Sequence, residues 1–149
     1  MAAITGSSVA EIDAPIDEVW KVVEDVLSAP DWQAGLKDVV ELERGGDRQV
    51  TLVESYSDAK VRTIKSIVRF SYEEPTRLSW KQEKGELKSV DGSWELEDLG
   101  DGRTRATYTL EVDLGRMLGM VIRGPLVDAL RGQLVNARAG ELKARVEGT

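Results

Sequence analysis

The sequence RMLGMVIRGPLVDALRGQLVNARAGELKARV, residues 116–146, decides how the rest of the chain is organised. From Leu126 onward its apolar residues recur at helical spacing along one stripe, as in an amphipathic helix. Leu130, Leu134 and Ala137 belong to that stripe, and the opposite face is polar. One side of the helix therefore meets water, and the other needs an apolar surface, which we expect the upstream strands to supply.

Gly124-Pro125 interrupts the helical pattern a third of the way along. Proline lacks an N–H and its ring clashes with the carbonyl four residues earlier, so we expect a kink or two helices end to end. The segment before the break carries Met117 and Met120, whose flexible side chains adapt to irregular partners. One hypothesis is that residues 116–123 form a gate over a ligand cavity. The alternative is that the glycines of this segment only allow close packing on the sheet.

Between residues 39 and 114 the apolar pattern has a period of two, and turn residues divide it into six strands. The predicted turns are 45–47, 57–59, 74–76, 84–86 and 100–102. One face of each strand is apolar and the other carries charged residues, which predicts a meander with one covered face. Upstream, a short strand at 9–12 precedes helix starts at Pro15 and Pro30.

These patterns predict an α+β fold in the order β-α-α-β6-α. We expect a strongly curved antiparallel sheet of about seven strands wrapped around the long C-terminal helix, the arrangement called a helix-grip fold. The sequence contains no internal repeat and no linker, so residues 1–149 are expected to form a single domain.

The composition excludes several kinds of chemistry. The 149 residues include no cysteine and no histidine, which removes disulfides, the usual zinc sites, and Ser/His or Cys/His catalysis. We expect no metal and no cofactor. The net charge of −7 argues against a nucleic-acid partner, because phosphate contacts need a basic surface.

The charge is unevenly distributed along the chain. The first 31 residues are acidic overall, whereas residues 116–149 are basic overall. A solvated helix face accounts for the basic end, and a transient membrane contact is the alternative. No apolar run is long enough to span a bilayer and no signal-peptide pattern is present, so we expect a cytoplasmic location. The sequence leaves the oligomeric state open.

Six short motifs carry a resemblance to a known family: IDAPIDEVW at 12–20, PDW at 30–32, RLSW at 77–80, DGSW at 91–94, GRT at 102–104 and LKARVE at 142–147. In this order and spacing they make nearly the whole chain similar to the START-like superfamily (SRPBCC). The branch it resembles is the bacterial polyketide cyclase/dehydrase and lipid-transport group, which includes coenzyme Q-binding proteins. The resemblance implies an apolar small molecule held between the concave sheet and the last helix. Gly124-Pro125 is a departure, because relatives tend to keep a continuous, more basic helix.

Strand parity selects candidate ligand contacts, because residues two apart face the same side of a sheet. Glu54 is in phase with Leu52, and a turn at 57–59 would set it opposite Arg62 as an ion pair on the concave face. The full set of candidate ligand-binding residues is Glu54, Tyr56, Arg62, Ser66, Trp80, Gln82, Trp94, Tyr108, Met117, Met120 and Leu130. The two tryptophans and Tyr108 have an alternative role in the core, and Glu54 and Gln82 can instead be wet strand ends.

Three functions are consistent with these features. The first is binding of a hydrophobic small molecule such as a lipid, a quinone or a polyketide. The second is an aromatase/cyclase in which Arg62, Tyr56, Glu54 or Tyr108 bends a polyketide chain and polarises a carbonyl. The third is a protein-interaction module with a closed cavity. No residue can be assigned as catalytic from the sequence.

Overall fold

The curved sheet consists of seven antiparallel strands, and the first strand along the chain pairs with the last. The computed structural model describes residues 3–148. Its strands are β1 (Ala3–Ile12), β2 (Leu36–Arg44), β3 (Val50–Asp58), β4 (Thr63–Glu73), β5 (Arg77–Gly85), β6 (Ser89–Gly100) and β7 (Arg103–Asp113). Their order across the sheet is β1-β7-β6-β5-β4-β3-β2, so every strand from β2 to β7 pairs with its neighbours in sequence.

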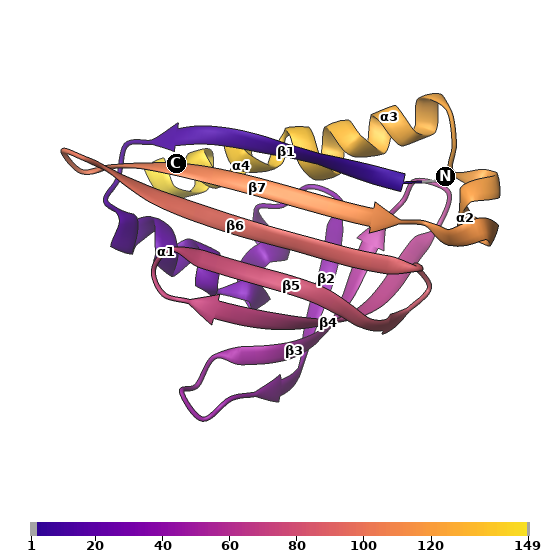
Figure 1. Cartoon of the computed structure of the whole chain (residues 1–149), viewed down its shortest axis with the longest axis horizontal. Helices are drawn as coiled ribbons and strands as arrows, with labels where there is room; N and C mark the ends of the chain where they lie inside the picture. The colour runs from indigo at the N-terminus through magenta and orange to yellow at the C-terminus, as the bar shows by residue number, and fades with distance from the viewer. Residues whose placement is uncertain (1–2, 149) are drawn as a thin grey trace.

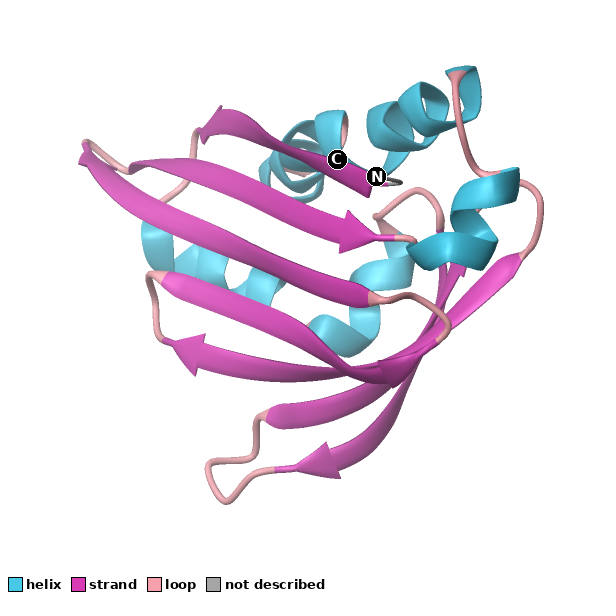
Figure 2. Cartoon of the chain, turned by 45° about the vertical axis from the view of Figure 1, so that its right-hand side comes forward, coloured by secondary structure: helices cyan, strands magenta, loops and turns pink. Residues whose placement is uncertain are grey.

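The helices lie on the concave side of this sheet. After β1 come α1 (Ile16–Glu24) and the 3-10 helix η1 (Val26–Asp31); after β7 come α2 (Gly115–Val121), α3 (Pro125–Arg131), the π-helical turn η2 (Gly132–Asn136) and α4 (Arg138–Glu147). Figure 1 shows α3 and α4 running along β1 and β7, and Figure 2 shows the sheet curving around the helices. The predicted α+β fold with a C-terminal helix in a curved sheet is confirmed.

The C-terminal region is broken at Gly124-Pro125, as the sequence predicts. Gly124 has φ 63° and ψ −135°, a conformation that glycine adopts without a Cβ penalty, and Pro125 begins α3. Helix α2 is therefore separate from the helical rod formed by α3, η2 and α4 (Figure 1).

The π-helical turn η2 is not predicted by the sequence pattern, and it changes which residues face the sheet. The N–H of Ala137 donates to the carbonyl of Gly132, five residues earlier, at 3.1 Å. One extra residue in a turn rotates the residues that follow by about 100° relative to a continuous α-helix. Ala137, predicted on the buried stripe, is consequently exposed, and Arg138 is buried instead.

Strand β3 faces the opposite way from the prediction. The turn after it lies at 59–62, not 57–59, so Glu54 pairs with Ile67 across the strands and not with Arg62. The pairing with β2 skips Thr51, which lies between Val50 and Leu52, so the apolar phase of Val50 does not continue to Leu52. Leu52 and Glu54 remain in phase with each other, because the pairing with β4 is unbroken from Leu52 to Asp58, and the apolar face that we assigned to Leu52 is the outer one. The residues of β3 that face the concave side are Val53, Ser55 and Ser57.

Other boundaries differ less. Strand β1 begins at residue 3 instead of 9, and the turn after β5 lies at 86–88. Pro30 lies inside η1 and does not start a second helix. A 3-10 turn needs only bonds between residues three apart, such as the one from the Trp32 N–H to the Ala29 carbonyl at 3.1 Å, so it tolerates this proline.

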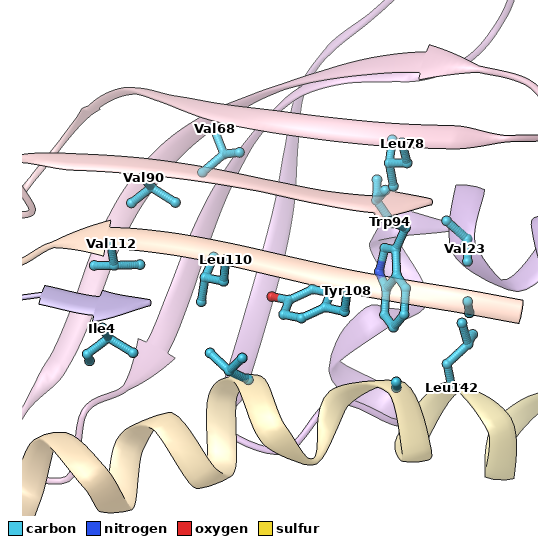
Figure 3. Packing of buried hydrophobic residues seen from close by; sticks show 14 of the residues in the cluster. Ile4, Val23, Val68, Leu78, Val90, Trp94, Tyr108, Leu110, Val112 and Leu142 are labelled. Atoms are coloured by element: carbon cyan, nitrogen blue, oxygen red, sulfur yellow. The ribbon is translucent and has the colours of Figure 1, made fainter. Parts of the chain in front are cut away.

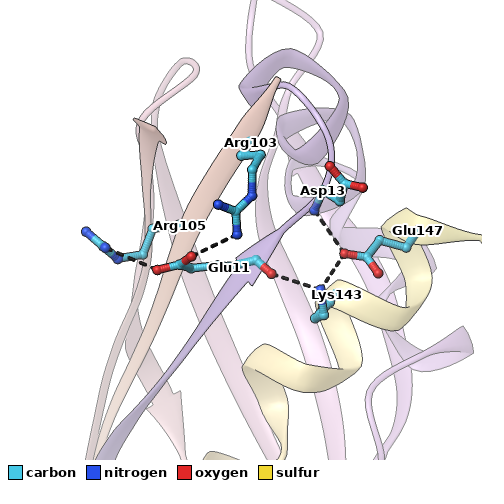
Figure 4. A network of polar contacts seen from close by, with 6 residues as sticks. All are labelled: Glu11, Asp13, Arg103, Arg105, Lys143 and Glu147. Carbon is cyan, nitrogen blue, oxygen red and sulfur yellow. Dashed lines mark hydrogen bonds and ion pairs between the residues drawn. The ribbon is translucent and has the colours of Figure 1, made fainter. Parts of the chain in front are cut away.

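The C-terminal end of α4 is fastened to β1 by polar contacts (Figure 4). Lys143 Nζ donates to the Glu11 carbonyl at 2.9 Å, and the Asp13 N–H donates to Glu147 Oε2 at 2.9 Å. The Glu11 carboxylate in turn pairs with arginines of β7, Arg103 and Arg105. Hydrogen bonding from Arg105 is the main cause that lowers the pKa of Glu11. Helix, edge strand and sheet are thus joined at this end of the molecule.

Candidate ligand cavity

A cavity lies between the concave face of the sheet and the C-terminal helices. The volume of this cavity is about 180 Å³, more than ten times the roughly 10–15 Å³ that one water molecule needs. Figure 3 shows the apolar side chains of β4, β6 and β7 pointing from the sheet toward the helix. The apolar lining includes Ile4, Ile64, Val68, Leu78, Val90, Leu110, Val112, Leu114, Ile122, Leu130 and Leu134. A space of this size and lining is suited to a small organic molecule.

Aromatic rings form one connected wall of this cavity and of the adjoining core. Seven of the eight aromatic residues are in contact in series, Tyr56 being the exception. The successive ring-centre distances are 6.3 Å for Trp32–Trp94, 4.7 Å for Trp94–Tyr108, 5.7 Å for Tyr108–Trp80, 6.0 Å for Trp80–Phe70, 6.3 Å for Phe70–Tyr72 and 6.5 Å for Tyr72–Trp20. Tilted and edge-on rings pack favourably with one another and offer polarisable faces to a ligand.

Strand β6 makes room for the central tryptophan of this wall. Trp80 lies opposite Gly92 across the β5–β6 pair. A Cβ on Gly92 would come within 2.3 Å of the Trp80 indole, closer than non-bonded carbon atoms can approach. Only glycine at position 92 therefore allows the indole to lie flat over the neighbouring strand.

Arg138 is the one arginine among the cavity-lining residues, and its side chain is only 4% exposed. Its guanidinium donates to Glu141 Oε1 at 2.7 Å and to the Ala34 carbonyl at 3.0 Å, and it lies 5.7 Å from the ring centre of Tyr108. The Arg138 Nε is buried and has no hydrogen-bond partner within residues 3–148. Glu141 also accepts a hydrogen bond from the Ala34 N–H at 3.0 Å, so the ion pair joins α4 to the segment before β2.

The ring of Tyr108 lies beside this ion pair, and Figure 3 shows its hydroxyl group on the side of Leu110. Burial raises the pKa of the Tyr108 phenol, and the nearby Arg138 charge offsets part of that increase. The phenol is therefore protonated at neutral pH and can donate a hydrogen bond. Arg138 and Tyr108 together form one polar end of a mostly apolar cavity, whose other polar lining residues are Gln33, Ser55, Ser57, Asp58 and Ser66.

Three serines add neutral polar groups along one side of the cavity, and a glutamine behind the wall holds one of them in place. Ser55, Ser57 and Ser66 line the cavity from β3 and β4. The Ser66 hydroxyl donates to Gln82 Oε1 at 2.7 Å, and Gln82 Nε2 donates to the Leu87 carbonyl at 2.8 Å. Gln82 therefore positions Ser66 from behind.

Five of the eleven candidate residues lie on the cavity wall: Ser66, Trp80, Trp94, Tyr108 and Leu130. The other six do not. Gln82 is one hydrogen bond away, behind Ser66. The side chains of Met117 and Met120 are directed outward from α2, with 83% and 65% of their surface exposed. The buried residues on the inner side are Leu118 of α2 and Ile122, which directly follows the helix.

The expected ion pair between Glu54 and Arg62 does not form. With β3 reversed, Glu54 and Tyr56 face the outer side of the sheet, where the Tyr56 hydroxyl donates to Glu54 and Lys65 lies 3.8 Å from it. Arg62 pairs instead with Glu86 of the β5–β6 turn. These three residues are therefore removed from the cavity.

Sequence reasoning missed Arg138. The available signal was its spacing, because it lies eight residues after Leu130 and four after Leu134. The π-helical turn that brings it inward leaves no recognisable pattern in the sequence.

The comparisons with known proteins agree with this architecture. A START superfamily protein from Mycobacterium smegmatis is 20% identical with a TM-score of 0.81, and the match covers 96% of this chain and 97% of that one. The Zhui aromatase/cyclase from Streptomyces sp. R1128 is 20% identical with a TM-score of 0.79, over 97% of this chain and 94% of that one. A protein from Thermus thermophilus is 20% identical with a TM-score of 0.77, over 95% of this chain and 97% of that one. The search of curated proteins found no match.

The curved seven-stranded sheet around a C-terminal helix is the helix-grip fold, which the chain shares with these solved structures. The family model described as "Polyketide cyclase / dehydrase and lipid transport" matches residues 3–147, and the chain belongs to this family. The family resemblance inferred from the short motifs is thereby confirmed. Among residues 3–148 no helix is both long and apolar enough to cross a membrane.

Proposed function

We propose that the protein binds a neutral, mostly apolar small molecule with an oxygen acceptor at one end, in the class of lipids, quinones or polyketides. The observation that carries this proposal is the polar end formed by Arg138 and Tyr108 within an aromatic, apolar cavity. The Arg138 charge is already balanced by Glu141 at 2.7 Å, so a neutral carbonyl or hydroxyl oxygen suits the site better than a carboxylate. The proposed contacts are Ser66, Trp80, Trp94, Tyr108, Leu130 and Arg138.

Native mass spectrometry of freshly purified protein tests this function. We expect masses above that of the bare chain, corresponding to a co-purified ligand. In the variant Val68→Phe a larger side chain would occupy the cavity and these masses should disappear, whereas Val9→Phe adds the same side chain to an exposed position and should retain them. Absence of any adduct, together with no binding of added quinone, lipid or polyketide surrogates, would refute the proposal.

A cyclase is the second candidate, and the juxtaposition of Tyr108 and Arg138 favours it. A protonated phenol and a guanidinium 5.7 Å from its ring could together polarise a ketone of a folded chain. The other groups considered for this role, Glu54, Tyr56 and Arg62, do not line the cavity. Turnover of a poly-β-ketone surrogate, abolished in Tyr108→Phe while ligand mass adducts persist, would distinguish an enzyme from a binding protein. The open cavity supports both over a closed interaction module.

A further inference from the structure

The two ends of the sheet carry opposite charge. Because the strands alternate in direction, the connections after β3, β5 and β7 lie at one end, and those after β1, β2, β4 and β6 lie at the other. The first set, residues 59–62, 86–88 and 114–124, contains five basic residues and one acidic residue. The second set, residues 13–15, 45–49, 74–76 and 101–102, contains four acidic residues and one basic residue. Arg62 and Lys88 of the first set pair with Glu86 and Asp113. The remaining basic residues, Lys60, Arg116 and Arg123, make this end locally cationic in a chain whose net charge is −7.

Apolar side chains protrude from the same cationic end, on two different elements. Helix α2 exposes Met117, Met120 and Val121, and the β3–β4 turn exposes 53% of Val61. On α2 these residues are flanked by Arg116 and Arg123, which are exposed and form no ion pair within residues 3–148. We call the set Val61, Arg116, Met117, Met120, Val121 and Arg123 the mouth patch.

The mouth patch adjoins the cavity. Ile122 and Ala59 line the cavity wall, and each lies within two residues of an exposed apolar member of the patch, Val121 and Val61 respectively. Figures 1 and 2 show α2 standing apart from the helical rod at this end of the molecule. The helix begins at Gly115, which has φ 80°, and Gly124, which has φ 63°, follows it before α3. Glycine adopts positive φ without a Cβ penalty, so the chain turns at both positions without backbone strain.

We propose that the mouth patch docks on the surface of an anionic lipid bilayer. A short helix with apolar residues on its outer face and arginines beside them matches the boundary between headgroups and acyl chains. Anionic lipids attract basic residues near the surface, and the acidic opposite end would face away. Four protruding side chains are too few for a stable protein interface, which buries about 800 Å² per partner. This docking goes beyond the proposed function, since it requires no bound ligand.

Co-sedimentation with vesicles tests the proposal. We expect the wild-type chain to sediment with phosphatidylcholine vesicles that contain phosphatidylglycerol at low salt, and to be released at high salt or when phosphatidylglycerol is omitted. Arg116→Gln/Arg123→Gln should bind roughly tenfold more weakly, because each basic residue near an anionic surface contributes to the attraction. Met117→Ser/Met120→Ser should lose binding to a similar degree, through the apolar part of the contact.

The matched control is Val40→Ser/Leu42→Ser, which removes two exposed apolar residues from β2 and should leave vesicle binding unchanged. Circular dichroism confirms folding of each variant. The proposal is overturned if the wild type ignores anionic vesicles, if the β2 variant loses binding equally, or if salt has no effect. It is also overturned if size-exclusion chromatography shows a dimer that Met117→Ser/Met120→Ser dissociates, since a second copy would then cover the patch.

Discussion

The two partners of the Arg138–Glu141 ion pair are buried to different degrees, so removing one or the other should change the stability by different amounts. Glu141→Ala would leave a buried guanidinium without its counter-charge, and we expect it to lower the free energy of unfolding by about 3 kcal/mol. Arg138→Met keeps an apolar side chain of similar length and leaves Glu141, 20% exposed and bonded to the Ala34 N–H, so its cost should be smaller. Urea titrations of both variants give the comparison. The prediction is contradicted if Arg138→Met has the lower free energy of unfolding of the two variants. The contacts of Arg138 would then contribute more to stability than the counter-charge of Glu141 does.

Single residues also show where sequence reasoning stops. Tyr108, Trp80 and Trp94 could be placed on the concave face because alternation holds along β5, β6 and β7. Arg138 was missed despite its helical spacing after Leu134, since a charged residue in a helical pattern is expected to be solvated unless a partner is known. Its partner Glu141 and the Ala34 backbone become visible only in three dimensions.

Glycines in a strand and in a helix are expected to respond oppositely to the same substitution. Gly92→Ala in β6 would bring a methyl group to within 2.3 Å of the Trp80 indole, and we expect a loss of about 1–3 kcal/mol from overpacking. Gly140→Ala in α4 meets no atom within 4 Å and should stabilise the protein by about 0.5–1 kcal/mol through helix propensity. Thermal unfolding checks both signs, and near-UV circular dichroism should change only in Gly92→Ala. If the two variants change the unfolding temperature equally, the Trp80 indole must be able to shift away from a methyl group at position 92.

Among the secondary-structure elements, those with regular geometry followed the sequence pattern, and those with insertions did not. The concave faces of β4 to β7 were assigned from alternation, and Gly124-Pro125 separated α2 from α3 as expected. Strand β3 was assigned backwards because its pairing with β2 skips Thr51, an extra residue between Val50 and Leu52 that a period of two does not anticipate. The π-helical turn η2 had the same effect on the last helix. The first deviation accounts for the misplaced Glu54 and Tyr56, and the second accounts for the missed Arg138.

The molecule as a whole retains a cavity at a place where a domain that binds no ligand would have a filled core. The unfilled volume lowers the free energy of unfolding, and this loss can be measured. Val68→Phe fills part of the space with apolar atoms, and we expect it to raise the free energy of unfolding by about 0.5–2 kcal/mol, as cavity-filling substitutions commonly do. Leu130→Ala enlarges the same space and should lower it by about 2–5 kcal/mol. Leu130 is fully buried on the helix side and Val68 is buried on the sheet side, so the pair probes both walls.

Added ligand connects this stability cost to binding. A bound molecule stabilises the wild type in proportion to the logarithm of its free concentration, so an added ligand should raise the unfolding temperature of the wild type and leave that of Val68→Phe unchanged. The exposed control Val9→Phe should behave like the wild type in both conditions. If Val68→Phe is less stable than the wild type and still responds to ligand, the cavity must contract in solution around its own side chains, and the ligand must bind elsewhere. If it is more stable and unresponsive, the same unfilled volume both weakens the fold and accommodates the ligand.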